Sequence, residues 1–176
     1  FQVAEASAPS KVTDLTVTPG ENGALQATIE WNNPTTTFGR GGTLISIESV
    51  VVYRDGEVIK TFTGVAPGEH LSMVDEVPES RFYSYRVQCF NEAGPGDRKA
   101  VSAFIGHDTP MAVTELTATA DDSADHKITV SWTAPTTGIY GGWIDVENLC
   151  YRVVRSDGET LYNDFKETSF TDAPAS

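Results

Sequence analysis

The strongest constraint on this chain is an internal repeat whose period exceeds half of its length. An alternating segment that ends in Trp and is followed by Pro three residues later occurs at residues 27–34 and again at residues 128–135. The two tryptophans, Trp31 and Trp132, stand 101 positions apart in a chain of 176 residues. A repeat of this length is typical of whole modules, so we expect two copies of one architecture, the second of them shorter.

Both copies are built from short alternating segments. Residues 12–16 and 113–117 share a Val-Thr-x-Leu-Thr pattern, which is typical of a half-buried strand. Asp-Gly pairs at 55–56 and 157–158 each follow a β-branched run, and this pair is a strong hairpin signal. No segment of ten or more residues shows helical periodicity, so the sequence predicts an all-β chain.

The second copy lacks the last part of the first. After Asp75, copy one continues with a long alternating segment at 83–91 and another at 99–104, whereas copy two has no counterpart after Asp172. A sandwich without these two strands leaves one strand edge unpaired and one sheet face open to water. We expect either further chain beyond Ser176 to complete it or a partner to supply strands by edge addition, and self-association through these strands is one form of the second case.

Residues 77–96 carry a combination of features that resembles fibronectin type III domains. Val77-Pro78 is followed by Tyr83, six positions after the Val, then by inward positions at Tyr85, Val87 and Cys89, and then by Asn-x-x-Gly-x-Gly. The resemblance implies an immunoglobulin-like β-sandwich in which Tyr83 is the tyrosine-corner residue and Trp31 and Trp132 are core residues.

On this basis we expect a flexible segment at 1–9, a complete module at 10–106 and a second module at 107–176 that lacks strands F and G. The glycine-rich loop after each Trp is similar to loops in modules of bacterial surface and secreted proteins.

Charge and composition argue against several classes of function. The chain has 25 Asp and Glu against 12 Lys and Arg, and a net charge of −13 repels nucleic-acid phosphates and anionic membranes. Its apolar runs are strand-sized and too short to span a bilayer. Residues 1–10 have neither a basic nor an apolar region of a signal peptide, so we expect that any targeting segment has been removed.

The sequence does not predict a catalytic, metal or cofactor site. The histidines at 70, 107 and 126 have no Cys or second His at metal-ligand spacing. Nucleotide-binding, nucleophile-elbow and zinc-protease motifs are absent from the sequence. We therefore expect a protein that is not an enzyme and that uses no cofactor or metal.

The loop between the second and third strands of each copy is the candidate contact surface. It carries Phe38 and Arg40 in copy one and Tyr140 and Trp143 in copy two, which are residue types that anchor interfaces or stack on sugars. The alternative is that these side chains fold back over the edge of the core, as repeated positions in a repeat often do.

The resemblance implies a non-catalytic role in a larger extracellular or cell-surface protein, in which the modules act as adhesive elements or spacers that contact a protein or a glycan. One alternative is that they position the catalytic domain of a secreted hydrolase that lies outside these residues. Another is a carbohydrate-binding module.

Overall fold

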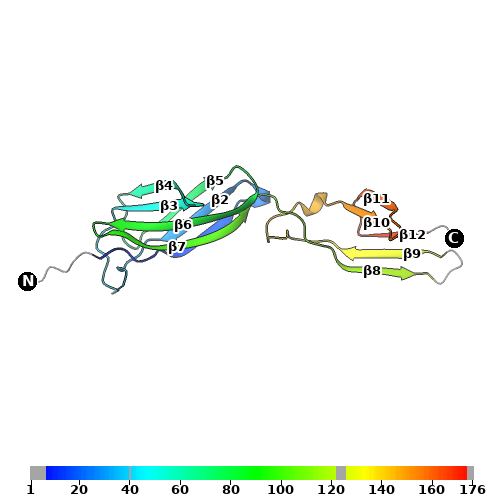
Figure 1. Ribbon diagram of the computed structural model, residues 1–176, viewed down its shortest axis with the longest axis horizontal. Helices are drawn as coiled ribbons and strands as arrows, with labels where there is room; N and C mark the ends of the chain where they lie inside the picture. The colour runs from blue at the N-terminus through cyan, green and yellow to red at the C-terminus, as the bar shows by residue number, and fades with distance from the viewer. Residues whose placement is uncertain (1–6, 40, 122–125, 174–176) are drawn as a thin grey trace, which may run out of the picture. The chain divides into compact units, whose positions relative to one another are not determined.

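The computed structural model describes residues 7–39, 41–121 and 126–173. The chain divides into two compact units, residues 1–106 and residues 107–176. Within the described residues of unit 1 there are seven strands, and Figure 1 shows them in two layers: β1 Thr13–Pro19, β2 Gln26–Asn32, β3 Ser49–Arg54, β4 Glu57–Thr63, β5 His70–Glu76, β6 Arg81–Asn91 and β7 Gly94–Ile105. A short 3-10 helix, Glu21–Gly23, lies between β1 and β2.

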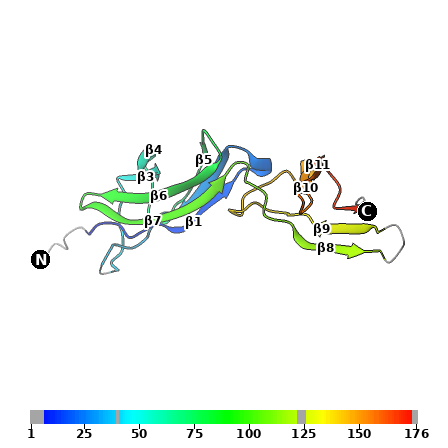
Figure 2. The same ribbon diagram turned by 45° about the vertical axis from the view of Figure 1, so that its right-hand side comes forward.

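The strands of unit 1 form two antiparallel sheets, one with the order β1-β2-β5 and the other with the order β4-β3-β6-β7 (Figure 2). Alternate residues on β2, β3 and β6 are buried because the period of a strand directs every second side chain to one face. These inward side chains meet in a single core between the sheets. The all-β sandwich predicted for the first copy is therefore confirmed.

Trp31 lies at the centre of this core. Its side chain is fully buried, its ring packs edge-to-face on Phe62 at a centroid distance of 5.6 Å, and its indole Nε1 donates to Oδ1 of Asn33 at 3.1 Å. Asn33 is itself buried and donates to the carbonyl of Ala66. The only polar atom of the indole ring thus has an acceptor two residues further along the chain, which removes the penalty of burying an unpaired donor.

The β3–β4 hairpin turns at Asp55 and Gly56, whose φ angles are +50° and +92°. Positive φ at both central residues defines a type I′ turn, which matches the twist of the flanking strands. At the same end of the module, where Asp55 N donates to the carbonyl of Ser84 at 2.8 Å, Tyr83 is buried and its hydroxyl donates to the carbonyl of Glu79 at 2.9 Å. The guanidinium group of Arg81 covers the Tyr83 ring at 3.9 Å from its centroid.

A partly buried polar cluster joins the two sheets of unit 1. The carboxylate of Asp75 accepts from the hydroxyl of Tyr85 at 2.7 Å and from Nη1 of Arg54 at 2.8 Å. Burial, followed by the hydrogen bond to Asp75, raises the pKa of Tyr85 well above its ordinary value of 10.0. On the same strand, burial raises the pKa of the Cys89 thiol from 9.0 to about 12.

These two shifts predict that unit 1 loses stability in alkaline solution. Tyr85 and Cys89 hold their protons to higher pH in the folded state than in the unfolded chain, so their contribution is complete below about pH 9 and falls as the pH rises toward the folded pKa values. Each group removes up to about 1.4 kcal/mol per pH unit within its own window. Urea unfolding of unit 1 between pH 7 and pH 11 measures this loss.

The Tyr85→Phe and Cys89→Val variants are the controls. Each is expected to have a flatter dependence on pH than the wild type because one titrating group is gone. A wild-type midpoint that does not change between pH 9 and pH 11 would contradict the prediction.

The described part of unit 2 contains five strands: β8 Thr114–Ala120, β9 Ile128–Thr133, β10 Tyr151–Val154, β11 Thr160–Phe165 and β12 Ser169–Asp172. One sheet has the order β12-β9-β8, and β10 pairs with β11 in a separate hairpin. A short 3-10 helix, Val146–Asn148, precedes β10. These elements repeat β1 to β5 of unit 1, and the described residues contain no counterpart of β6 and β7, in agreement with the predicted loss of strands F and G.

The core of unit 2 is correspondingly open. Trp132 and Ile144 are its buried apolar side chains within the described residues, and all seven residues of β8 are exposed. Trp132 packs in an aromatic group with Tyr151, Phe165 and Phe170, with Tyr162 beside the two phenylalanines. Among the described residues, the second layer over this sheet face consists of the β10–β11 hairpin alone, so it excludes water only in part.

One expectation about the segments that lead into the two units needs correction. Residues 7–9 were assigned to a flexible segment, but Pro9 is fully buried and bridges to Thr37. Residues 107–110 belong to unit 2, within the range expected for the second module, and Asp108 among them is buried and hydrogen-bonded within that unit. Both segments are held because they add backbone pairing to the loop after the second strand, a contact that a single-sequence pattern does not indicate.

Candidate functional site

The candidate site in each unit is the loop between the second and third strands, which we call the B–C loop: residues 33–48 in unit 1 and 134–150 in unit 2. A short segment before the first strand pairs with each loop, and we call residues 8–10 and 109–111 the lead segments. The same backbone bonds recur 101 positions apart: Phe38 N to Ala8 O and Ser10 N to Thr36 O in unit 1, Ile139 N to Thr109 O and Met111 N to Thr137 O in unit 2.

The B–C loop of unit 1 has two halves with different surroundings. Its tip turns at Gly39 and Gly41, which both have positive φ, and is closed by a bond from Thr37 N to the carbonyl of Gly42 at 2.7 Å. Phe38 at this tip is 60% exposed. The half that descends to β3 buries Leu44 and Ile47 in the core.

The tip of unit 1 is therefore available for contact, and the descending half covers the core edge. The expectation of an exposed contact surface applies to the tip, and the alternative, a loop that folds back over the core edge, applies to the descending half. Arg40 lies outside the described residues.

In unit 2 a buried carboxylate fixes the loop. Asp108 accepts from the backbone N–H of Thr109 at 2.7 Å, of Tyr140 at 2.9 Å and of Gly142 at 2.9 Å. Gly138 must lack a side chain because a Cβ there would overlap the carboxyl group of Asp108. Three charge-assisted bonds to one loop hold its tip in a single conformation.

Two apolar side chains project from this tip. Ile139 is 51% exposed and Tyr140 is 55% exposed. Trp143, in contrast, is partly buried and packs edge-to-face on the ring of His107 at 4.7 Å between centroids. Phe38 and Tyr140 are thus placed as exposed tip residues, whereas Trp143 contributes to the packing of its own loop.

The sequence did not indicate two parts of this site. Ile139, which occupies the position of Phe38 in the repeat, was not a candidate because it is not aromatic. Asp108 was missed because position 7, its equivalent in copy one, is Ser. The repeat offset of 101 residues, which relates the two Trp residues, also relates residues 8–10 to residues 109–111. This offset was the available signal that the lead segments have the same role in both copies.

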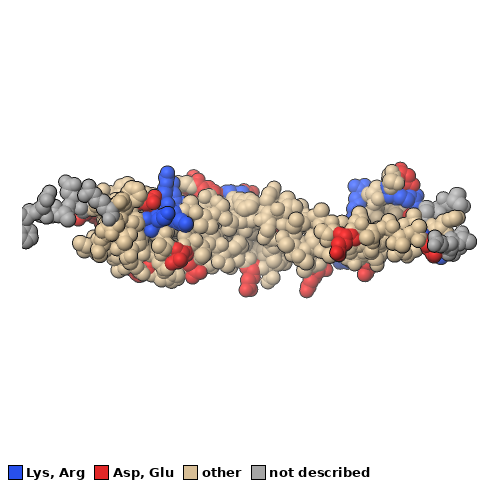
Figure 3. Space-filling model, turned by 90° about the horizontal axis from the view of Figure 1, so that it is seen from below, with Lys and Arg blue, Asp and Glu red and all other residues tan. Residues whose placement is uncertain are grey.

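The described residues do not suggest a metal centre, since they contain no group of three His, Cys, Asp or Glu placed to hold an ion. Figure 3 shows one face of the molecule, on which acidic side chains are scattered over both units and basic side chains gather in a few places. None of the described helices is long and apolar enough to cross a membrane.

In unit 1 the sheet β1-β2-β5 faces the sheet β4-β3-β6-β7, and this strand order is that of the fibronectin type III sandwich. The core Trp lies on β2, and the hydroxyl of Tyr83 donates to the carbonyl of Glu79 in the preceding turn. Unit 1 thus has the fold of an immunoglobulin-like β-sandwich, and the described strands of unit 2 repeat the first five strands of that arrangement.

No protein-family model matches the sequence, and neither does any curated protein. Among solved structures, the chain is similar to the FN1-FN3 domains of chicken CNTN1, with 18% identity and a TM-score of 0.42 over 95% of this chain and 57% of that one. It is also similar to the central fibronectin-III array of RIM-binding protein, with 17% identity and a TM-score of 0.36 over 97% of this chain and 58% of the other. The chain spans less than three fifths of both.

Proposed function

We propose that the two units are non-catalytic contact and spacer modules of a larger extracellular or cell-surface protein, and that the tips of the B–C loops touch a protein or glycan partner. The observation that carries this proposal is the repeated exposure of an apolar tip on a fixed loop. Phe38 in unit 1 and Tyr140 in unit 2 are both more than half exposed. An apolar side chain held in water by a fixed loop stabilises a contact more than it stabilises the module itself.

The rigidity of the loops supports this role. The lead segments and, in unit 2, the carboxylate of Asp108 fix the loop backbone before any partner arrives. A pre-organised loop loses little conformational entropy on binding, so more of the contact energy appears as affinity. Aromatic groups such as Phe38 and Tyr140 then supply large contact areas with few rotatable bonds.

The test is binding of the purified chain to immobilised glycans and extracellular-matrix proteins, with Phe38→Ala and Tyr140→Ala as variants. For the ligand that the wild type binds, each variant is expected to weaken binding about 10-fold or more, since anchors in interfaces have effects of this size. Thermal unfolding should be unchanged within about 0.5 kcal/mol because the tips are exposed.

Val74→Ala is the matched control, because Val74 is 58% exposed but lies on β5 and not in a B–C loop. It is expected to leave both binding and stability unchanged. If Val74→Ala weakens binding as much as the loop variants do, or if the loop variants bind normally, the contact surface is not at the B–C tips.

A further inference from the structure

One face of unit 1 differs in charge from the rest of this acidic chain. Alternate residues of the β4-β3-β6-β7 sheet point away from the core, and we call them the outer face: residues 49, 51 and 53 on β3, 58, 61 and 63 on β4, 82, 84, 86, 88 and 90 on β6, and 98, 100, 102 and 104 on β7. None of them is Asp or Glu, and two, Arg86 and Arg98, are basic. The chain as a whole has 25 acidic against 12 basic residues, so the outer face is a positive area on a negative molecule.

The other sheet of unit 1 has the opposite distribution. On the side of β1-β2-β5 that points away from the core, Glu30 lies on β2 and Glu76 on β5. The nearest basic group to Glu30 on that side is His70, whose Nε2 lies 3.6 Å from the Glu30 carboxylate. The absence of acidic side chains is therefore a property of the outer face and not of both sheet surfaces.

The two arginines of the outer face have no carboxylate partner among the described residues. The carboxylate of Asp97, next to Arg98, accepts from the backbone N–H of Arg98 and not from its guanidinium group. Other described arginines do form ion pairs with Asp or Glu, namely Arg54, Arg81 and Arg155. The charges of Arg86 and Arg98 thus remain available to an anion from outside the chain.

The guanidinium group of Arg86 is already held in place. Its central carbon lies 4.0 Å from the centroid of the Tyr53 ring, and its Nε is buried without a hydrogen-bond partner. Stacking on the ring orders the group but satisfies none of its N–H donors. A carboxylate that binds there gains charge-assisted hydrogen bonds without the entropy cost of ordering a long side chain.

The spacing of the two arginines sets the spacing of the groups that they can bind. Arg98 stands opposite Gln88, which is two residues after Arg86 on β6. Diagonal neighbours of this kind have Cβ atoms about 7–8 Å apart. Side chains at positions i and i+2 of an extended peptide point to one side and are about 6.5 Å apart. Two carboxylates at i and i+2 therefore match Arg86 and Arg98.

Apolar side chains border the arginines and favour a polypeptide as the occupant. Val58 is 59% exposed and stands opposite Tyr53. Phe82 is 48% exposed and packs edge-to-face on Phe104 at 5.4 Å between centroids. The net charge of −13 repels densely charged polymers such as nucleic acids and sulfated glycans. A segment with only two carboxylates is repelled far less, because salt screens charges beyond about 8 Å and the groups in contact decide its affinity.

We propose that the outer face binds an extended segment of a partner protein that has acidic residues at positions i and i+2. One carboxylate accepts from Arg98 and the other from Arg86. An apolar residue at i+4 lies on the same side of the segment and contacts the surface around Val58. This binding site contains no residue of the B–C loops, so it does not depend on the function proposed for their tips.

The probe is a synthetic peptide, Gly-Glu-Thr-Glu-Thr-Tyr-Gly, capped at both ends and added to the intact chain labelled with ¹⁵N. The Nε–H signal of Arg86, assigned with Arg86→Lys, is expected to shift and saturate with a Kd of about 1 mM or tighter. Backbone amides of residues 84–88 and 98–102 should shift with it, whereas those of β2 should not. The same peptide with Gln in place of both Glu residues is expected to cause no saturable shift.

Two neighbouring residues of β7 provide a variant and its matched control. Arg98→Gln removes one of the two proposed contacts, and Lys99→Gln makes the same change of charge at the next position, which alternates to the other side of the strand. Arg98→Gln is expected to weaken binding of the Glu peptide about 10-fold. Lys99→Gln should change it less than about 2-fold, because it alters only the long-range field. Both side chains are exposed, so neither change should shift thermal unfolding.

Four results would overturn the proposal. The first is the absence of any shift at peptide concentrations up to about 5 mM. The second is equal binding of the Glu and Gln peptides, which would show an apolar contact alone. The third is an equal effect of Arg98→Gln and Lys99→Gln, which would show attraction by net charge and no specific contact. The fourth is tighter binding of a heparin oligosaccharide or an oligonucleotide at the same residues, because the partner would then be a polyanion.

Discussion

Replacing Trp31 by Ala is expected to lower the free energy of unfolding of unit 1 by about 3 to 5 kcal/mol, since it removes a large buried side chain and leaves a cavity. The same change removes the hydrogen bond from the indole N–H to Asn33 and the edge-to-face contact with Phe62. Differential scanning calorimetry should show the transition of unit 1 shifted down by about 10 °C or more.

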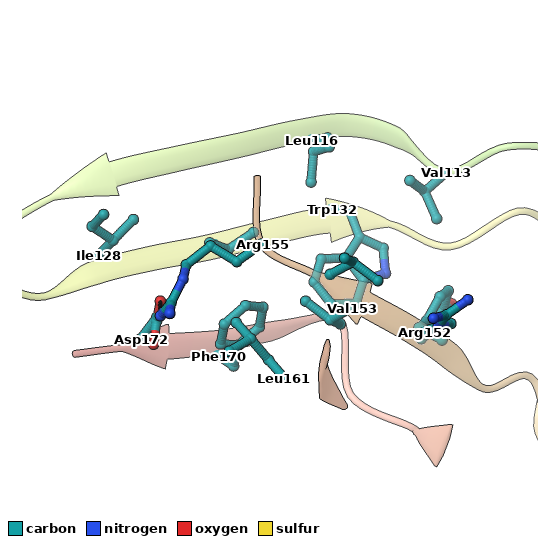
Figure 4. A pocket seen from close by; sticks show the side chains of 13 residues that line it. Val113, Leu116, Ile128, Trp132, Arg152, Val153, Arg155, Leu161, Phe170 and Asp172 are labelled. Atoms are coloured by element: carbon teal, nitrogen blue, oxygen red, sulfur yellow. Dashed lines mark hydrogen bonds and ion pairs between the residues drawn. The ribbon is translucent and has the colours of Figure 1, made fainter. Parts of the chain in front are cut away.

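Trp132→Ala is the matched control in the second copy. This side chain is also buried, at 8% exposure, but it lines a hollow between the β8–β9–β12 sheet and the β10–β11 hairpin (Figure 4), and its Nε1 is unpaired. The loss of stability is expected to be below about 2 kcal/mol, because the remaining side chains can collapse into space that is already open. An equal loss in the two units would show that the core of unit 2 is closed in solution.

The second large effect is expected for Asp75→Ala, which should destabilise unit 1 by about 3 kcal/mol. The change leaves Arg54 without its carboxylate and Tyr85 with an unpaired hydroxyl in the core. The Asp75 side chain is only 11% exposed, so water replaces the lost bonds poorly. Chemical denaturation monitored by tryptophan fluorescence measures the loss.

Asp172→Ala tests the same position in unit 2. Arg155 has two further carboxylate partners there, Asp157 at 2.8 Å and Glu159, so its charge stays paired. We expect a loss of less than about 1 kcal/mol, as for other exposed ion pairs. A loss as large as that of Asp75→Ala would mean that a group not seen in unit 2 depends on this carboxylate.

The fold could be predicted from the sequence because its signals are local and repeated. The alternation around Trp31, the Asp-Gly turn and the spacing from Val77 to Tyr83 each describe one strand or turn, and the second copy reproduces most of them. The Arg54–Asp75–Tyr85 cluster was not predictable in the same way. Its members come from three strands, and only the pairing of the sheets brings them together.

The candidate site was predictable only in part. Phe38 and Tyr140 were candidates because they are aromatic. Residue type alone does not distinguish an exposed ring from a packed one such as that of Trp143, whose position depends on a contact with His107. Asp108 accepts hydrogen bonds from backbone N–H groups, and the pattern of side chains in the sequence does not indicate such bonds. The role of the lead segments depends on pairing between residues about 28 positions apart, which local periodicity does not report.

The lead segments also give the fold a mechanical property. In unit 1, Pro9 is held between two elements, because Ala8 and Ser10 bond to the B–C loop while the carbonyl of Pro9 accepts from Asp97 N at 2.9 Å on β7. Tension applied to the chain before residue 8 therefore acts on these few bonds before it reaches the ladder of β1. Unit 2 has the equivalent loop bonds at residues 109–111. A pull along the chain would thus release the loop that carries Phe38 before it unfolds a sheet, so that force could alter the loop tips while the sandwich stays intact.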